Sequence, residues 1–224
     1  MTDQLIIGDK GSFDGFEASL ASRTIGMPSK KSIKETVPFS NVTYDFSKIN
    51  GEVYWEEREL EYVFEIIAPT PERLEELKAA FSNWVMNVFQ EEIHDPFIPD
   101  HHFIGTFEDI EYDDEEGLDK TTATVTFTAY PYKIANIQKV YEVECPVAVS
   151  PSVVIVNESS HPIVPTIKAE TDIILNVDGE HFEIAAGEVT NEDLRFPAGA
   201  VSVSITNTSN EAHKVTILFY EEVF

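Results

Sequence analysis

Residues 58–66 have the sequence Arg-Glu-Leu-Glu-Tyr-Val-Phe-Glu-Ile, and this stretch decides the first half of the fold. Every second position from Leu60 to Ile66 is large and apolar, and most positions between them are glutamate. A period of two is typical of an antiparallel strand with one buried and one solvated face. Because Asn50-Gly51 is a strong turn signal, we expect residues 42–46 to form the partner strand of a hairpin.

The residues after this strand predict a helix. Thr70 is a good N-cap, Pro71 suits the first helical position, and Glu72 interacts favourably with the helix dipole. Apolar side chains then recur at helical spacing to about residue 89, which predicts one stripe packed on a sheet. The residues of this stripe are Leu74, Leu77, Phe81, Trp84, Val85 and Val88.

Two further strands and two loops complete the first half. Residues 103–112 and 121–130 predict a hairpin, joined by the acidic segment 113–117, and the second strand alternates Thr with apolar residues. Residues 93–103 contain two prolines and predict a loop. Residues 23–38 combine Gly, Pro and Lys, which predicts a mobile loop or arm with local positive charge.

The second half lacks any helical pattern. Short Val/Ile/Thr-rich runs, separated by turn residues, recur at the spacing typical of a β-sandwich. These runs are 153–156, 166–169, 173–177, 181–184, 201–206 and 213–220. We therefore predict an α+β domain at 1–135, with antiparallel strands and one packed helix, followed by an all-β sandwich domain at 139–224.

The charge of the chain excludes several kinds of partner. It has 15 Lys and Arg against 41 Asp and Glu, a formal net charge of −26. Such a chain repels nucleic acid and anionic membrane surfaces, so we expect neither as a partner. Its first ten residues hold only three consecutive apolar residues, so we expect no secretion signal and no membrane segment.

The sequence offers little support for catalysis. It contains neither a Gly-x-Ser-x-Gly elbow nor a phosphate loop, so we predict no enzyme activity, no catalytic residues and no cofactor. An enzyme would be the third choice, and it would have to lose activity when His94 or His101 is changed. The single cysteine, Cys145, excludes an internal disulfide and is interpreted as an inert thiol.

Two clusters in the sequence contain residue types that bind metal ions. The residues His94, Asp95, Asp100, His101 and His102 include metal-ligand types, but two prolines interrupt them and helical His spacing is absent, which favours a solvated loop. The acidic run 109–116 offers oxygen ligands for Ca²⁺ but lacks the spacing of a twelve-residue calcium loop. A charged hairpin tip that blunts strand pairing is the better interpretation, and no metal is predicted.

Several ordered motifs resemble those of a known family. The stretch Val42-Thr-Tyr-Asp-Phe-Ser, followed by Gly51-Glu-Val-Tyr-Trp-Glu-Glu-Arg58 and the strand to Ile66, resembles the N-terminal domain of siphophage or prophage distal tail proteins. The helix, Gly105-Thr-Phe107 and Pro131-Tyr-Lys133 follow in the same order. The segments Asn176-Val-Asp-Gly-Glu180 and Phe196-Pro-Ala-Gly199 resemble the galectin-like sandwich of that family.

This resemblance implies a structural role in a virion. The N-terminal domains would form a six-membered ring at the tip of a long non-contractile tail, with the sandwiches projecting outward. Expected partners are further copies of the chain, the tail tube protein, a tail-associated fibre or hub protein, and a receptor-binding protein. The protein would be made in the bacterial host cytoplasm and reside at the tail tip.

The arm supplies the predicted interface. Arg23, Lys30, Lys31 and Lys34 form a cluster of positive charge in an acidic chain. Because opposite charges attract, we hypothesise that this cluster docks on an acidic face of a neighbouring subunit or of the tube protein. Ring closure by head-to-tail contacts would suit such an arm.

The alternative function is a carbohydrate-binding adhesin module that contacts the host cell wall. Sugar stacking needs an exposed aromatic ring beside polar groups, and fold alone does not imply it. The aromatic residues of the second half are Tyr141, Phe182, Phe196, Phe219, Tyr220 and Phe224, most of them at core positions of the strand pattern. The polar candidates His161, His181, Asn207 and Arg195 are scattered, so the tail ring is favoured.

Overall fold

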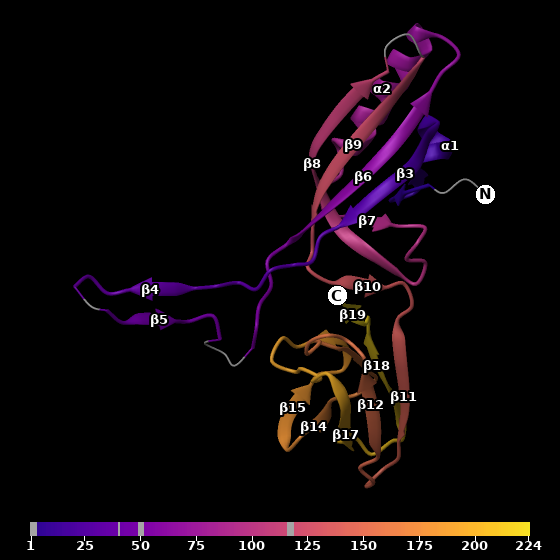
Figure 1. Cartoon of the computed structure of the whole chain (residues 1–224). Coiled ribbons are helices and arrows are strands. Elements are labelled where there is room, and N and C mark those ends of the chain that lie inside the picture. The colour runs from indigo at the N-terminus through magenta and orange to yellow at the C-terminus, as the bar shows by residue number, and fades with distance from the viewer. Residues whose placement is uncertain (1–3, 40, 49–51, 116–118) are drawn as a thin grey trace. The chain divides into compact units, whose positions relative to one another are not determined.

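The computed structural model describes residues 4–39, 41–48, 52–115 and 119–224, which divide between two compact units, Met1–Lys133 and Ile134–Phe224. The first unit combines an antiparallel sheet with helices, and the second is a β-sandwich (Figure 1). The predicted fold class, an α+β domain followed by an all-β sandwich, is confirmed. No helix among the described residues is long and apolar enough to span a membrane.

The first unit is built on one mixed-length antiparallel sheet. Its strands, in spatial order, are β2 (Lys10–Gly11), β1 (Ile6–Ile7), β7 (Glu91–His94), β8 (His101–Asp114), β9 (Lys120–Ala129), β6 (Arg58–Ile67) and β3 (Ala18–Ile25). The predicted apolar face of β6 is fully buried from Leu60 to Ile66. It lies in register with the apolar face of β9, where Leu60 is opposite Phe127 and Phe64 is opposite Ala123.

The strand partner predicted for β6 is wrong. Both edges of β6 are occupied by longer strands, β3 and β9. Residues 43–45 instead form β5 (Thr43–Asp45), which pairs with β4 (Lys34–Thr36). The longer partners form ladders along most of β6, and β9 buries a continuous apolar face beside that of β6, whereas residues 43–45 remain exposed. The predicted turn at Asn50-Gly51 lies outside the described residues.

The predicted helix is α2 (Pro71–Val85), and it covers the sheet as expected. Its N-cap is Thr70, whose side chain accepts a hydrogen bond from the Arg73 backbone N–H at 3.3 Å. Leu74, Leu77, Phe81 and Val85 are buried in the core. The helix ends four residues before the predicted limit, and residues 86–87 form a turn that still places Val88 in the core.

Two elements of this unit, α1 and β7, were not predicted from the sequence. The helix α1 (Ser12–Phe16) has only five residues, too few for a helical period, and its Phe16 ring stacks on Trp84 with centroids 4.7 Å apart. The predicted loop at 93–103 is only partly correct, because residues 91–94 form β7 between β1 and β8. In β7 only Ile93 is buried, so the sequence has no apolar alternation from which this strand could be predicted.

The second unit packs two sheets of four strands each, among the residues described. One sheet has the order β11 (Lys139–Cys145), β18 (His213–Phe219), β13 (Thr166–Ala169) and β16 (Gly187–Thr190). The other has the order β12 (Ser152–Asn157), β17 (Gly199–Asn207), β14 (Ile173–Val177) and β15 (Glu180–Ile184). Two short strands, β10 (Lys133–Ala135) and β19 (Glu222–Val223), pair with each other.

The sandwich core consists of the inward side chains of both sheets. Fully buried members include Ile155, Ile167, Leu175, Val203 and Ile217. Cys145 is buried among them, and burial raises the pKa of its thiol. The strands β11 and β16 were not predicted. In β11 the alternation of Tyr141, Val143 and Cys145 with Glu142 and Glu144 was the available signal, whereas β16 has four residues, begins with a glycine and buries none of them.

Candidate interaction surfaces

The segment between β3 and β6, residues 26–57, is named the arm here. Its strands β4 and β5 form a two-stranded hairpin in which Lys34 is opposite Asp45 and Thr36 is opposite Thr43. Backbone hydrogen bonds extend the ladder, from Phe46 N–H to the Ile33 carbonyl at 2.8 Å and from Lys31 N–H to the Tyr54 carbonyl at 2.9 Å. Figure 1 shows this hairpin standing apart from the main sheet of its unit.

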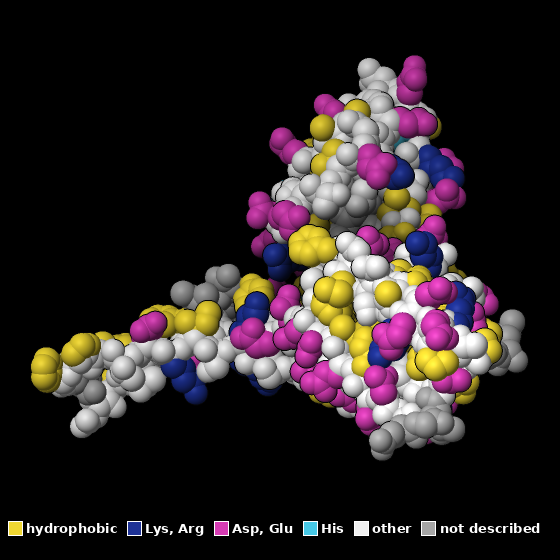
Figure 2. All heavy atoms as spheres, turned by 90° about the horizontal axis from the view of Figure 1, so that it is seen from above, with side chains coloured by type: hydrophobic (Ala, Val, Ile, Leu, Met, Phe, Trp, Pro, Cys, Tyr) yellow, Lys and Arg dark blue, Asp and Glu magenta, His cyan; other side chains and the backbone are white. Residues whose placement is uncertain are grey.

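One face of the hairpin carries five exposed apolar side chains together with one carboxylate, that of Glu35, which lies opposite Tyr44. Because side chains alternate along strands, the register places Ile33 beside Phe46 and Val37 beside Val42 on the face that also carries Tyr44. The exposed fractions are 54% for Ile33, 51% for Tyr44 and 40% for Phe46. The opposite face carries Lys34, Thr36, Thr43 and Asp45. Figure 2 shows hydrophobic side chains gathered along the arm.

Two aromatic rings on this face stack on each other, and both remain exposed to solvent. The Tyr44 and Phe46 rings lie nearly parallel, with centroids 6.3 Å apart. An isolated two-stranded hairpin is marginally stable in water, and a row of exposed large apolar side chains marks an interaction site. The arm therefore has the composition of an element that packs against another surface.

Three of the four predicted arm cations lie on this segment. Lys30, Lys31 and Lys34 are all exposed, and the Lys30 ammonium lies 5.6 Å from the centre of the Trp55 ring. Lys48, which the sequence prediction omitted, is a further exposed cation of the arm. Its position in the chain, just past the alternating segment 42–46, was the available signal.

Arg23 lies elsewhere. It belongs to β3, and its guanidinium forms an ion pair with Asp95 while lying 4.9 Å from the centre of the Phe97 ring. The Tyr62 hydroxyl donates to the same carboxylate at 3.3 Å, and burial next to Asp95 raises the pKa of this tyrosine. Arg23 thus fastens β3 to the loop after β7 instead of presenting charge with the three lysines.

A second arginine near this pair is buried. Arg58, at the start of β6, is 2% exposed and stacks over the Phe103 ring at 5.6 Å. Its Nε and Nη2 atoms have no hydrogen-bond partner among the described residues, and burial lowers the pKa of its guanidinium. Its side chain is therefore held by packing as much as by hydrogen bonds.

The predicted histidine and aspartate cluster separates into parts. Asp95 forms the ion pair with Arg23, Asp100 lies in the turn before β8, and His101 is the first residue of β8. His94 and His102 lie close together, with ring centroids 5.2 Å apart, and Glu92 joins them. The sequence prediction did not include Glu92, whose only signal is its position two residues before His94 on one strand face.

The acidic run is partly neutralised by ion pairs. Asp114 lies 2.9 Å from the Lys78 ammonium, and Glu115 lies 2.9 Å from that of Lys120. Hydrogen bonding by the side chains of Thr121 and Lys78 lowers the pKa of the Asp114 carboxyl group. Glu116 and Gly117 lie outside the described residues. The run therefore joins α2 and β9 by charge pairs at the end of the hairpin.

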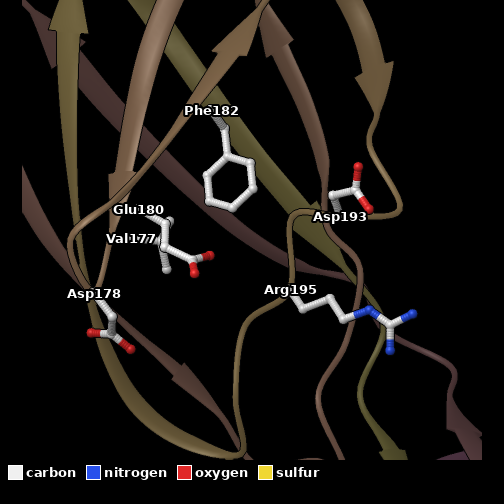
Figure 3. Close-up of a pocket in the computed structure, with 6 residues that line it drawn as sticks. All are labelled: Val177, Asp178, Glu180, Phe182, Asp193 and Arg195. Atoms are coloured by element: carbon white, nitrogen blue, oxygen red, sulfur yellow. The ribbon is translucent and has the colours of Figure 1, made fainter. Parts of the chain in front are cut away.

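The sandwich carries a polar pocket with a volume of about 330 Å³. Its lining residues are Val177, Asp178, Glu180, Phe182, Asp193 and Arg195. Figure 3 shows the Phe182 ring between Glu180 on one side and Asp193 on the other. Arg195, one of the polar residues that the sequence prediction described as scattered, thus lies in one pocket with the aromatic residue Phe182, whereas His161, His181 and Asn207 do not line it.

Comparisons with known proteins identify the fold. No protein-family model and no curated protein matches the sequence. The crystal structure of the Dit protein of phage SPP1, described as a paradigm of the hub adsorption apparatus in phages infecting Gram-positive bacteria, matches over 100% of both chains at 13% identity and a TM-score of 0.71. The chain therefore has the fold of that protein.

A second solved structure is more distant. The baseplate of phage P2, in its activated conformation with Ca, covers 96% of this chain and 98% of its own at 10% identity and a TM-score of 0.37. A score of this size carries no argument about function. The fold implied by the sequence resemblance is therefore confirmed through the SPP1 Dit structure alone.

Proposed function

We propose that this protein is a structural, non-enzymatic component of a phage tail tip, a distal tail protein located in the virion. Six copies form a ring that connects the tail tube to the fibre, hub or receptor-binding apparatus. The observation that carries the proposal is the fold of the SPP1 Dit hub protein, matched over the whole length of both chains. The family motifs on β6 and in the sandwich support it independently.

The arm provides the contact that closes the ring in this proposal. Its apolar face, formed by Ile33, Val37, Val42, Tyr44 and Phe46, packs on the first unit of a neighbouring copy. The occupant is a second copy because symmetric assembly repeats one such contact at every subunit. The lysines of the arm favour this partner too, because the chain that receives them has a net charge of −26.

The oligomeric state of the purified protein tests the assembly. Native mass spectrometry and negative-stain microscopy should show rings of six at micromolar concentration. The double variant Tyr44→Asp/Phe46→Asp should remain monomeric, because it places charge on the apolar face. The control Thr36→Asp/Thr43→Asp, on the opposite face of the same hairpin, should still form rings.

Two results would overturn this proposal. Wild-type protein that stays monomeric up to high micromolar concentration would remove the ring. Rings that persist in the Tyr44→Asp/Phe46→Asp variant would remove the arm from the interface. Circular dichroism of each variant establishes that the fold is retained.

The arm lysines have a separate test. Reversal of Lys30, Lys31 and Lys34 to Glu should weaken ring formation, because the arm would then repel an acidic neighbour. Arg23 is left unchanged in this variant, since its charge is already paired with Asp95. Ring formation that is unchanged after all three reversals contradicts the electrostatic part of the proposal.

The pocket of the sandwich favours a second candidate function, carbohydrate binding. An aromatic ring, an arginine and three carboxylates line one cavity of about 330 Å³, and such a mixture suits stacking and hydroxyl recognition of a sugar. Host cell-wall glycans on an array should then bind the wild type and not the Phe182→Ala or Arg195→Ala variants. Equal signals from all three proteins would exclude this pocket as the site.

A further inference from the structure

Three potential metal ligands converge between β7 and β8. Glu92 and His94 are two residues apart on β7, so their side chains share one face of the sheet. The β7–β8 ladder pairs Ile93 with Phe103, and its next position sets His94 opposite His102. The Glu92 carboxylate lies 3.1 Å from His94 Nε2 and 3.9 Å from His102 Nε2. All three ligand atoms lie within 4.8 Å of one another.

We propose that Glu92, His94 and His102 bind one divalent transition-metal ion of the zinc class. Two imidazoles and one carboxylate are a ligand set that Zn²⁺ accepts, with a fourth position left for water. Ligand atoms about 2.1 Å from a tetrahedral ion are separated by about 3.4 Å, a value between the two measured distances. Small rotations of exposed side chains therefore complete the site.

The surroundings of the three residues suit a cation. The ion-pair contacts of Glu92 among the described residues are with the two imidazoles, and none of them involves Lys or Arg. His102 is buried and fixes one ligand, whereas the side chains of His94 and Glu92 are 34% and 57% exposed and give an ion access from solvent. An ion held here links β7 to β8 at the base of the loop that carries Asp95.

The ligand types also predict which ions do not bind. Imidazole suits Zn²⁺, Co²⁺ and Ni²⁺, while Ca²⁺ and Mg²⁺ require sites made mainly of oxygen ligands. A site formed by the acidic run at the end of β8 would show the opposite preference. Ion selectivity therefore separates the proposed site from non-specific attraction to an acidic protein.

The experiment uses full-length, tag-free protein that has been stripped with EDTA and dialysed. Titration with Co²⁺ should produce visible absorption that saturates at one equivalent and is abolished by Zn²⁺. Saturating Zn²⁺ should raise the Tm of the first unit by about 5 °C or more, because an ion that binds only the folded state stabilises it. Ca²⁺ and Mg²⁺ at the same concentration should leave the Tm unchanged.

Matched variants locate the ion. Glu92→Gln, His94→Ala and His102→Ala should each weaken Co²⁺ binding about 100-fold or more, since even the loss of groups that orient a ligand costs 10–100-fold. His101→Ala is the control, because alternation along β8 places His101 on the face opposite His102. It should bind Co²⁺ as the wild type does.

The outcome is decisive even if the buried His102 variant folds poorly, because Glu92 and His94 are accessible and their replacement leaves the core intact. Absence of Co²⁺ absorption in the wild type would overturn the proposal. So would loss of binding in His101→Ala equal to that in His94→Ala. The site is independent of ring assembly, so a monomeric protein that binds Co²⁺ refutes the proposed ring and leaves the metal site standing.

Discussion

Asp95 is a buried carboxylate whose partners come from three parts of the first unit. Its side chain is inaccessible to solvent, and it accepts from Arg23 of β3, from Tyr62 of β6 and from the Phe97 backbone N–H. Burying a charge is costly unless it is paired and hydrogen-bonded, so these contacts depend on one another. The cluster ties the loop after β7 to the opposite edge of the sheet.

Removing the guanidinium should therefore destabilise the first unit. We expect Arg23→Ala to lower its free energy of unfolding by about 3 kcal/mol, because Asp95 is left buried without its cation. Urea unfolding followed by tryptophan fluorescence measures this, since Trp55 and Trp84 are the two tryptophans and both belong to this unit. Arg73→Ala is the control, because the ion pairs of Arg73 are exposed to solvent and such pairs contribute little to stability. Equal losses of unfolding free energy in the two variants would show that the buried ion pair stabilises the unit no more than an exposed one.

At the scale of elements, α2 shows that tertiary packing stabilises a helix whereas a local cap fixes where it begins. Its amphipathic stripe buries four apolar side chains against the sheet, which supplies most of its stability. Its start is fixed by Thr70, which satisfies the Arg73 backbone N–H that no helical carbonyl can reach. The cap adds a small and separable contribution.

The cap can be tested by itself. Thr70→Ala should lower the free energy of unfolding of the first unit by about 1 kcal/mol, while Thr70→Ser should cost only a few tenths because serine caps as well. Fluorescence of Trp84, which lies on α2, follows the transition in urea. A loss of 3 kcal/mol or more in Thr70→Ala would contradict a role limited to capping.

The arm is the element that intramolecular packing explains least. Its two strands pair with each other, and their large apolar side chains remain exposed. Edge strands that face solvent are usually protected by charge or by coverage. Here the large apolar side chains gather on one face, where Glu35 is the charged residue of β4, and Lys34 and Asp45 lie on the other face. A hairpin that docks on a partner is expected to have such a face.

At the scale of the whole molecule, the charge of −26 opposes assembly. Subunits of like charge repel one another, and salt screens exposed charges over a distance that shrinks from about 10 Å at 0.1 M to about 3 Å at 1 M. An interface formed mainly by the apolar face of the arm should therefore strengthen as salt rises. The lysines oppose this trend, because salt weakens their attraction as well.

We expect the first effect to dominate. Sedimentation velocity at 50 mM and 500 mM NaCl should show a larger fraction of rings at the higher concentration. The Lys30, Lys31 and Lys34 to Glu variant should show a steeper increase, because more repulsion is screened. Dissociation of wild-type rings at 500 mM NaCl would show that ion pairs, and not apolar contacts, hold the assembly.

The sequence by itself determined the elements whose pattern is local. The alternation at 58–66, the cap at Thr70 and the helical stripe after it depend only on the period of side chains along one segment, and the short strands of the sandwich follow the same rule. Charge and composition, which are sums over residues, likewise predict that the chain does not bind nucleic acid or anionic membranes. These properties do not depend on how distant segments meet.

Only the tertiary structure decided which segments meet. The pairing of β6 with β3, the separation of Arg23 from the arm lysines, and the short strand β7 depend on competition between distant partners, which no local period records. The candidate metal site is of this kind. His94 and His102 are eight residues apart and separated by two prolines, and only the β7–β8 ladder brings them, with Glu92, to one point.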